Sequence, residues 1–247
     1  MNRIYNLKPQ VEDKRDYIYI SQDITIPKSH FLNDSQMISC PVLDQGNLGS
    51  CLPNAIYALF YILSTRNITL SRLQLYMVCR AIDGSSLVED SGCTIRGSMK
   101  AISKYGICNE SLWSYNISNF DKLAPSNAFR DLYKLNEFIY TFIKQDLTSI
   151  KQVLASGSPI VVGILVYTSF ESTNATKYGT IQIPNTKKEK LLGGHAILLV
   201  GYDDNKKVFK FQNSWGIEWG DKGYGYIPYD YILDNTLAFD LCTVKFS

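Results

Sequence analysis

In the first half of the chain, apolar residues recur at the spacing of α-helices. Residues 55–64 form an apolar run without Gly or Pro, and residues 71–79 form a second periodic segment that Ser71 can cap. A third segment, residues 93–105, repeats its apolar positions every three or four residues and ends before Gly106. We therefore expect helices in these three segments, followed by a loop-rich stretch from residue 109 to about residue 126.

The second half changes to β-branched and apolar runs, which are typical of buried strands. The predicted strands are residues 159–167, 196–202, 208–213 and 223–228, with a short helix at 146–155 and a turn at 203–205. Helices that come first and an antiparallel sheet that follows predict an α+β fold in two lobes.

The composition is ordinary for a soluble globular protein: of 247 residues, 45% are hydrophobic and 19% are charged. The net charge of +2 gives no reason to expect nucleic acid or a membrane surface as a partner. No run approaches the roughly 18 apolar residues of a transmembrane helix, and residues 1–9 lack the apolar core of a secretory signal. None of the six cysteines stands in a Cys-x-x-Cys pair, so we expect no metal and no cofactor.

The most informative stretch is residues 44–55, which read DQGNLGSCLPNA. Two glycines and an Asn favour a tight loop, and Pro53 suits the first turn of the helix that follows. Cys51 is therefore expected at a helix N-terminus. There the helix dipole and the free N–H groups lower the pKa of a thiol and favour the nucleophilic thiolate.

A thiolate nucleophile needs a base, and the chain has only two histidines, His30 and His195. His195 stands far downstream of Cys51 in the run GGHAILLVGY, and Asn213 follows it in QNSWG. A Cys near the start of a chain with a distant His and Asn is the sequence form of a Cys-His-Asn triad.

These motifs together resemble those of the papain-like cysteine proteases. The run from Gln45 to Cys51, the run from Gly194 to Tyr202 and the run from Asn213 to Tyr224 stand in the family's order. The likeness covers about residues 35–235 and is nearest to the variety without a long prodomain, which occurs in microbes and large DNA viruses. It implies a papain-like two-lobe fold, with a helical lobe, an antiparallel β-barrel-like lobe and an active-site cleft between them.

The resemblance implies a cysteine endopeptidase that hydrolyses peptide bonds through a thioester acyl-enzyme. Cys51 would be the nucleophile, His195 the acid and base, and Asn213 the group that orients the imidazole. Gln45 would stabilise the oxyanion together with the backbone N–H of Cys51. The paired histidines of a carboxydipeptidase cannot form, because His30 is the only other histidine. The implied partner is a peptide or protein substrate.

The implied substrate contacts are small residues and one aromatic residue. They are Gly49 at the S1 subsite, Gly163, Gly194 and Ala196 at the S2 subsite, and Trp215 beside the bond between Asn213 and His195. Small residues at S2 would leave room for a bulky apolar side chain. Two departures alter this region: the chain reads TIRG after Cys93 in place of the family's Gly-Gly stretch, and Leu52 replaces the usual Trp.

Secreted family members usually carry a disulfide-bonded cysteine three residues before the nucleophile. Leu48 occupies that position here, and Cys93, near the usual partner position, then has no partner. The missing bridge and the missing signal favour an intracellular or virion-associated protein over a classically secreted one. We expect a monomer.

We expect a catalytic domain at residues 35–247. It consists of a helical lobe at about 45–134, a β lobe at about 135–235 and a C-terminal tail at 236–247. Residues 1–34 form an N-terminal arm in which residues 17–20 can pair as a short strand. The arm is either a surface segment or a short propeptide that lies over the cleft.

Three other functions remain open at this point. The chain could be a binding module that kept the fold without activity. The complete set of Gln45, Cys51, His195 and Asn213 argues against this alternative. It could be a structural virion component whose proteolysis is incidental. It could also transfer the acyl group to an amine instead of water.

Overall fold

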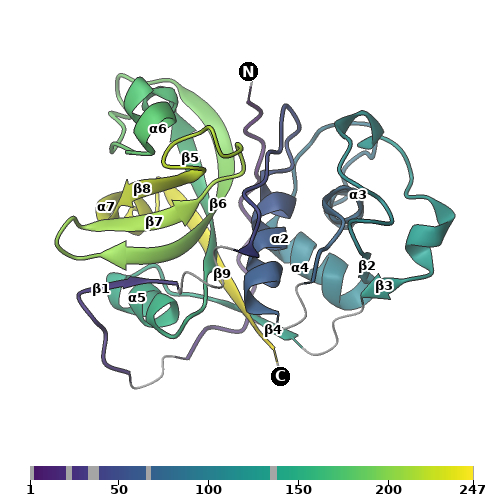
Figure 1. The fold of residues 1–247 in the computed structure, drawn as a ribbon, viewed down its shortest axis with the longest axis horizontal. Helices are drawn as coiled ribbons and strands as arrows, with labels where there is room; N and C mark the ends of the chain where they lie inside the picture. Colours follow the sequence, from purple (N-terminus) through teal and green to yellow (C-terminus); the bar gives the residue numbers. More distant parts are fainter. Residues whose placement is uncertain (1–2, 21–23, 33–38, 65–67, 134–137, 247) are drawn as a thin grey trace.

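The computed structural model describes residues 3–20, 24–32, 39–64, 68–133 and 138–246. Two lobes stand side by side, one built mainly from a sheet and the other from helices (Figure 1). The first described residues of the chain run between the two lobes (Figure 1). The α+β fold in two lobes predicted from the order of the apolar patterns is confirmed.

The helical lobe begins with α2 (Cys51–Leu63), which is buried along almost its whole length because nearly all its residues are apolar. Next comes α3 (Arg72–Ile82), where the Ser71 side chain accepts a hydrogen bond from Gln74 N as an N-cap should. The third predicted helix is divided into α4 (Ile95–Lys100) and a π-helical turn (Ala101–Tyr105). It ends at Gly106, whose positive φ of 79° suits glycine.

Only short elements occupy the predicted loop-rich stretch and its surroundings. These are β2 (Ile107–Cys108), the 3₁₀ turns Ile117–Asn119 and Ser126–Phe129, and β3 (Leu132–Tyr133). Strands β2 and β3 pair with each other and belong to no larger sheet among the described residues.

The other lobe is built on one antiparallel sheet of seven strands, ordered β4-β9-β5-β6-β7-β8 with β1 also paired to β6. Its strands are β1 (Ser29–Phe31), β4 (Phe138–Phe142), β5 (Ile160–Tyr167), β6 (Leu191–Asp203), β7 (Val208–Gln212), β8 (Tyr224–Pro228) and β9 (Ala238–Phe246). Within the described part of the chain, β8 and β4 do not pair, so the sheet is open and does not close into a barrel. The shorter helices α5 (Leu147–Ala155), α6 (Thr173–Tyr178) and α7 (Tyr229–Leu233) complete this lobe.

The segment predicted as a C-terminal tail, residues 236–247, was assigned wrongly. Residues Ala238–Phe246 form β9, which pairs with β4 on one side and with β5 on the other. Its central residues are buried, so this strand is part of the interior of the sheet. Strand β4 was missed as well, because a five-residue strand carries little periodic signal by itself.

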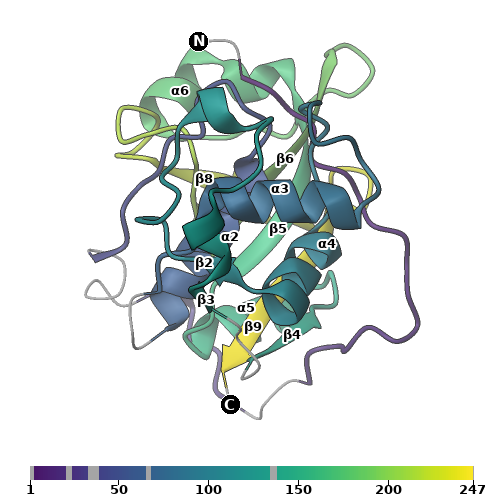
Figure 2. The same ribbon diagram turned by 90° about the vertical axis from the view of Figure 1, so that its right-hand side faces the viewer.

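The described residues 3–20 and 24–32 are joined to both lobes at several points. Ile18 forms an isolated bridge with Phe142, so residues 17–20 make one β-bridge where a short strand was expected. Further along, β1 pairs with β6 in antiparallel orientation, and His30 lies opposite Tyr202. Figure 2 shows the purple segment that ends at residue 20 passing along the outside of the molecule.

Strand β6 forms the wall that both hydrophobic cores share. Ala196, Leu198 and Val200 belong to a core that also contains α2 and α3. Ile197 and Leu199 point to the other face and belong to the core of the sheet lobe. Successive side chains of a strand point to opposite faces, so His195 shares the face of Ile197 and Leu199, while its neighbour Ala196 faces α2.

Candidate active site

Helix α2 and strand β6 bring Cys51 and His195 to the boundary between the lobes. Cys51 is the first residue of α2, as the loop before it predicted, and His195 lies on β6 opposite Ile164. Cys51 and Ala196 belong to the same hydrophobic core, which places Cys51 close to the strand that carries His195. Both side chains are fully buried, with exposed fractions of 1% for Cys51 and 0% for His195.

The imidazole of His195 is held by an amide and an indole. Its Nε2 lies 2.8 Å from Asn213 Oδ1, and its ring stacks on Trp215 with centroids 4.8 Å apart. The other nitrogen, Nδ1, is buried and makes no hydrogen bond to any residue that the structure describes. One imidazole nitrogen is thus fixed by Asn213, and the other is available for proton transfer.

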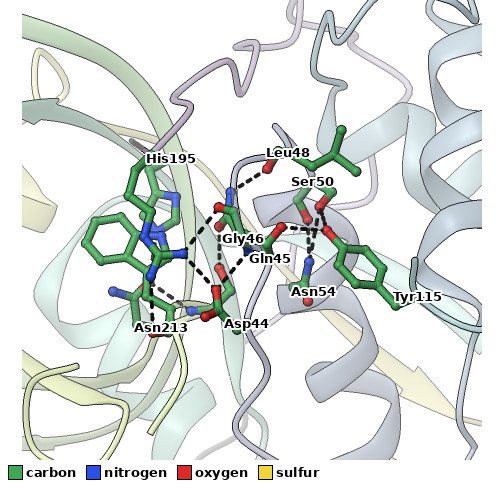
Figure 3. A network of polar contacts seen from close by, with 12 residues as sticks. Asp44, Gln45, Gly46, Leu48, Ser50, Asn54, Tyr115, His195 and Asn213 are labelled. Carbon is green, nitrogen blue, oxygen red and sulfur yellow. Dashed lines mark hydrogen bonds and ion pairs between the residues drawn. The ribbon is translucent and has the colours of Figure 1, made fainter. Parts of the chain in front are cut away.

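Gln45 is held at both ends of its side chain (Figure 3). Its Nε2 donates to Leu48 O at 2.9 Å, and its Oε1 accepts from Ser214 Oγ at 2.7 Å. The backbone N–H of Gln45 donates to Ser214 O at 2.8 Å, so the loop before α2 is tied to the loop that carries Asn213. One N–H of the Gln45 amide is used by Leu48, and the amide has a second to offer.

Tyr115 supports this loop from the helical lobe, and no motif indicated it. Its hydroxyl donates to Gln45 O at 2.9 Å and also bonds the Ser50 hydroxyl (Figure 3). Asn54 Nδ2 donates to Ser50 O at 2.8 Å within the first turn of α2. Tyr115 lies in the loop-rich stretch far along the chain, so only the fold brings it to Gln45.

Residues 3–8, here called the cleft segment, lie over Cys51 and His195. Leu7 N donates to Gly194 O at 3.1 Å, and Lys8 N donates to Cys93 O at 3.3 Å. The ring of Tyr5 meets the ring of His195 edge to face, with centroids 6.0 Å apart. The cleft segment therefore contacts both lobes and accounts for the burial of the site.

Arg3 and Tyr5 anchor the cleft segment at one end. Arg3 Nη1 donates to Asp44 Oδ1 at 2.7 Å and to Gly46 O at 3.2 Å, and its guanidinium lies 5.4 Å from the Trp215 ring centroid. The Tyr5 hydroxyl donates to Glu171 Oε1 at 2.5 Å. Two carboxylates, those of Asp44 and Glu171, thus accept hydrogen bonds from this end of the segment.

The family model described as papain family cysteine protease matches residues 26–237. The chain belongs to this family of cysteine proteases. A peptidase C1-like protein of Acanthamoeba polyphaga mimivirus, itself uncharacterised, is 35% identical over 97% of this chain and 77% of its own length. The thiol protease aleurain of Arabidopsis thaliana is 26% identical over 82% of this chain and 56% of its own length.

Among solved structures, xylellain, a cysteine protease from Xylella fastidiosa, superposes with a TM-score of 0.91 at 31% identity. The match covers 100% of this chain and 98% of xylellain. The predicted papain-like family and fold are therefore confirmed, and the chain is a papain-like thiol peptidase that acts on peptide or protein substrates.

Burial under the cleft segment favours the neutral forms of both central groups of the protease. Desolvation raises the pKa of Cys51 to about 12, against the smaller lowering effect of hydrogen bonds from Ala196 and Leu52. Desolvation lowers the pKa of His195 to about 4, partly offset by the bond to Asn213. The lowered thiol pKa expected from the helix N-terminus does not hold in this covered state, because removal of water outweighs the helix dipole.

The glycines named for substrate contact lie in different surroundings. Gly49 and Gly194 both contact the cleft segment, at Asn6 and Leu7 respectively. A Cβ on Gly163 would lie 2.4 Å from the ring of Phe239, so a side chain already fills that space. Ala196 is buried on the face of β6 toward α2.

A cleft-lining glycine was missed, because the family's Gly-Gly stretch was sought after Cys93 and not before it. A Cβ on Gly92 would lie 1.8 Å from Asn6 O, which places this glycine directly against the cleft segment. The Ser91-Gly92 pair in the sequence was the available signal.

All six cysteines of the protease lie in described parts of the chain, and all are free and buried. Leu48 is also buried, at 1% exposed, in the position where secreted relatives were expected to carry a bridged cysteine. In the described residues, no helix is long and apolar enough to cross a membrane. The same residues contain no group of three or more His, Cys, Asp or Glu side chains placed to hold a metal ion.

Proposed function

We propose that the protease is an endopeptidase that works through Cys51, His195 and Asn213, with Gln45 in the oxyanion hole. The arrangement of His195 carries this proposal. Its Nε2 lies 2.8 Å from Asn213 Oδ1, its buried Nδ1 has no described partner, and the next residue, Ala196, shares a core with Cys51. A nucleophile, a base and an orienting group in this relation can perform acyl transfer.

In the proposed reaction, the Cys51 thiolate attacks the peptide carbonyl carbon, and the π electrons of the carbonyl move to its oxygen. The Gln45 amide and the Cys51 N–H stabilise this oxyanion. The His195 imidazolium then gives its proton to the leaving amine, and a thioester to Cys51 remains. His195 next takes a proton from water, the hydroxide adds to the thioester, and Cys51 leaves as the thiolate.

We also propose that residues 1–34 act as a short propeptide, with the cleft segment as the part that blocks the site. Support comes from the exposed fractions of Cys51 and His195, 1% and 0%, beneath residues that hydrogen-bond to both lobes. Peptide substrate and the cleft segment would compete for the same backbone groups, such as Gly194 O. The absence of nucleic-acid and membrane partners, and a monomeric state, remain predictions.

The test uses the full chain with three anchors of the cleft segment removed, Arg3→Ala, Tyr5→Ala and Leu7→Ala, here called the loosened protein. We expect it to cleave internally quenched peptides with blocked ends, and the unchanged chain to cleave them at least about tenfold more slowly. Adding Cys51→Ala should abolish cleavage, whereas Cys108→Ala, another buried free cysteine, should not. Cleavage that survives Cys51→Ala would refute the mechanism.

Two further readouts separate the alternatives. Product masses in the presence of hydroxylamine distinguish transfer to an amine from hydrolysis by water. Alkylation of Cys51 reports access to the site without requiring turnover. A loosened protein that alkylates rapidly near pH 5 yet cleaves no peptide would favour transfer or an unsuited substrate, and one that alkylates only near pH 8.5 would indicate a binding module.

A further inference from the structure

A carboxylate stands in the wall of the cleft close to Cys51. The N–H of Gly49 donates to Asp90 Oδ1 at 3.1 Å and to Oδ2 at 2.9 Å, and the Tyr76 hydroxyl also donates to Oδ1. Because Gly49 lies two residues before Cys51, these bonds fix the carboxylate beside the nucleophile.

No basic group among the described residues forms an ion pair with this carboxylate. Arg80, fully buried behind the loop that carries Asp90, donates to Leu87 O at 2.8 Å and to Glu89 O at 2.7 Å. It holds the loop through backbone carbonyls. Across the described part of the chain, no Lys, Arg or His forms an ion pair with Asp90.

The cleft segment places Asn6 against this carboxylate. Asn6 Nδ2 donates to Asp90 O at 2.6 Å and to Asp90 Oδ1 at 3.3 Å. A Cβ on Gly49 would lie 2.0 Å from Asn6 Oδ1, so the amide packs directly on the bare backbone there. Both hydrogen bonds of Asn6 Nδ2 are therefore donated to oxygen atoms of Asp90.

The acceptor half of the same amide is not matched. Asn6 Oδ1 is buried and has no hydrogen-bond partner among the described residues. A buried acceptor without a donor is unfavourable. The subsite is the space beside Gly49 that the Asn6 amide occupies. It offers the backbone carbonyl and the carboxylate of Asp90 as acceptors. It therefore suits a group that only donates hydrogen bonds, such as an ammonium or a guanidinium.

We propose that Asp90 determines specificity by selecting a Lys or Arg side chain in the subsite beside Gly49, with Asn and Gln accepted less well and Asp and Glu rejected. The inference rests on the proposed function, in which a substrate replaces the cleft segment. It assigns the selected residue to the position just before the scissile bond, since the subsite adjoins the loop that carries Cys51.

The test compares cleavage by the loosened protein of peptides that differ at one position only. With Lys, Gln or Glu before the scissile bond, we expect kcat/KM to fall in that order, with Lys over Glu on the order of tenfold or more. Asp90→Asn keeps an oxygen for the Gly49 N–H and should bring the Lys-to-Glu ratio close to one. Asp44→Asn, the same change in a cleft carboxylate bonded to Arg3, should leave that ratio unchanged.

A second experiment needs no turnover and uses the complete chain. Asn6→Lys should seat the cleft segment more firmly and slow the alkylation of Cys51, whereas Asn6→Glu should place two carboxylates together and speed it. Both effects should shrink when Asp90→Asn is added.

The outcomes separate the two proposals. A Lys-to-Glu ratio at the position just before the scissile bond that Asp90→Asn does not change would overturn the role of Asp90. Equal alkylation rates for Asn6→Lys and Asn6→Glu would overturn it as well. A loosened protein that cleaves nothing would refute the proposed function, while the alkylation rates would still decide the preference of Asp90.

Discussion

The two walls of the cleft differ in how their polar groups are satisfied. On the helical side, Gln45, Ser50 and Tyr115 are joined in one hydrogen-bonded network (Figure 3). On the sheet side, His195 Nδ1 and Asn213 Nδ2 are buried without described partners. Aromatic rings hold this wall, with Trp215 stacked on His195 and Trp219 edge to face with Trp215.

This difference indicates that the two walls of the cleft have different roles in the reaction. A wall joined by hydrogen bonds is rigid and can present the remaining Gln45 N–H to a developing oxyanion without reorganisation. A wall held by ring packing leaves His195 Nδ1 free for a proton, and it can tolerate unpaired atoms while the cleft segment excludes water. The changes below test that division, beginning with the largest expected effect.

Removing the imidazole of His195 should have the greatest effect. In the loosened protein, His195→Ala should lower kcat by at least about 10⁴-fold, because acid and base are both lost. The matched control is His30→Ala, which removes the other histidine, on β1. A loss below tenfold for His195→Ala, measured with the same quenched peptide, would contradict the assignment of the base to this wall.

Removing a donor from the bonded wall should cost less. Gln45→Ala in the loosened protein should lower kcat by about 10²–10³-fold with little change in KM, since the oxyanion exists only after attack. Gln212→Ala serves as control, because its amide bonds Pro41 O on the sheet side. Equal effects of the two substitutions on kcat would argue against a rigid oxyanion donor at Gln45.

Acid should weaken the cover over the sheet wall. Burial lowers the pKa of His195 to about 4, below the ordinary 6.5, so the covered state binds fewer protons than an open state between these values. Falling pH in this window therefore favours opening. We expect exchange of the Leu7 amide hydrogen in the full chain carrying Cys51→Ala, in which no thiolate can form beside His195, to rise about tenfold or more from pH 6.5 to 4 after correction for its intrinsic rate.

Two variants show whether His195 is the group responsible. His195→Gln should flatten this pH dependence, while His30→Gln should leave it in place. Carboxylates at Asp44, Asp90 and Glu171 also bond the cleft segment, and any rise that persists in His195→Gln would belong to them.

A single bond within the helical wall should have the smallest effect. Tyr115→Phe removes the donor to Gln45 O and should lower the free energy of unfolding by about 1 kcal/mol, with a loss of kcat below tenfold. Denaturant unfolding of the full chain measures the first quantity. Tyr133→Phe, a more exposed tyrosine of the same lobe, should change it by less. Equal free energies of unfolding for Tyr115→Phe and Tyr133→Phe would mean that the hydrogen bond to Gln45 O does not stabilise the helical wall.

Local patterns in the sequence were enough to predict several elements. The apolar run after Pro53 predicted α2 and the position of Cys51 at its first residue, and Ser71 was predicted as the cap of α3. The family resemblance rests on short motifs around Gln45, His195 and Asn213, and the structure brings these side chains to one boundary. Such features depend on residues close together in the chain, so they can be read from it directly.

Long-range contacts could be decided only by the tertiary structure. Strand β9 is recognisable as a central strand only once β4 and β5 lie on either side of it. Asp90 reaches Gly49, and Tyr115 reaches Gln45, across long stretches of chain. Periodicity and spacing carry no information about such contacts.

The sequence by itself thus determined the family, the helices of the first lobe and the residues expected to carry the chemistry. The tertiary structure decided that residues 3–8 cover the site and that burial raises the pKa of Cys51 and lowers that of His195. It also decided that the buried Asn6 Oδ1 has no hydrogen-bond partner among the described residues, while Asn6 Nδ2 bonds Asp90. The physical reason is that burial and hydrogen-bond satisfaction depend on which segments meet, and that is set by packing of the whole chain.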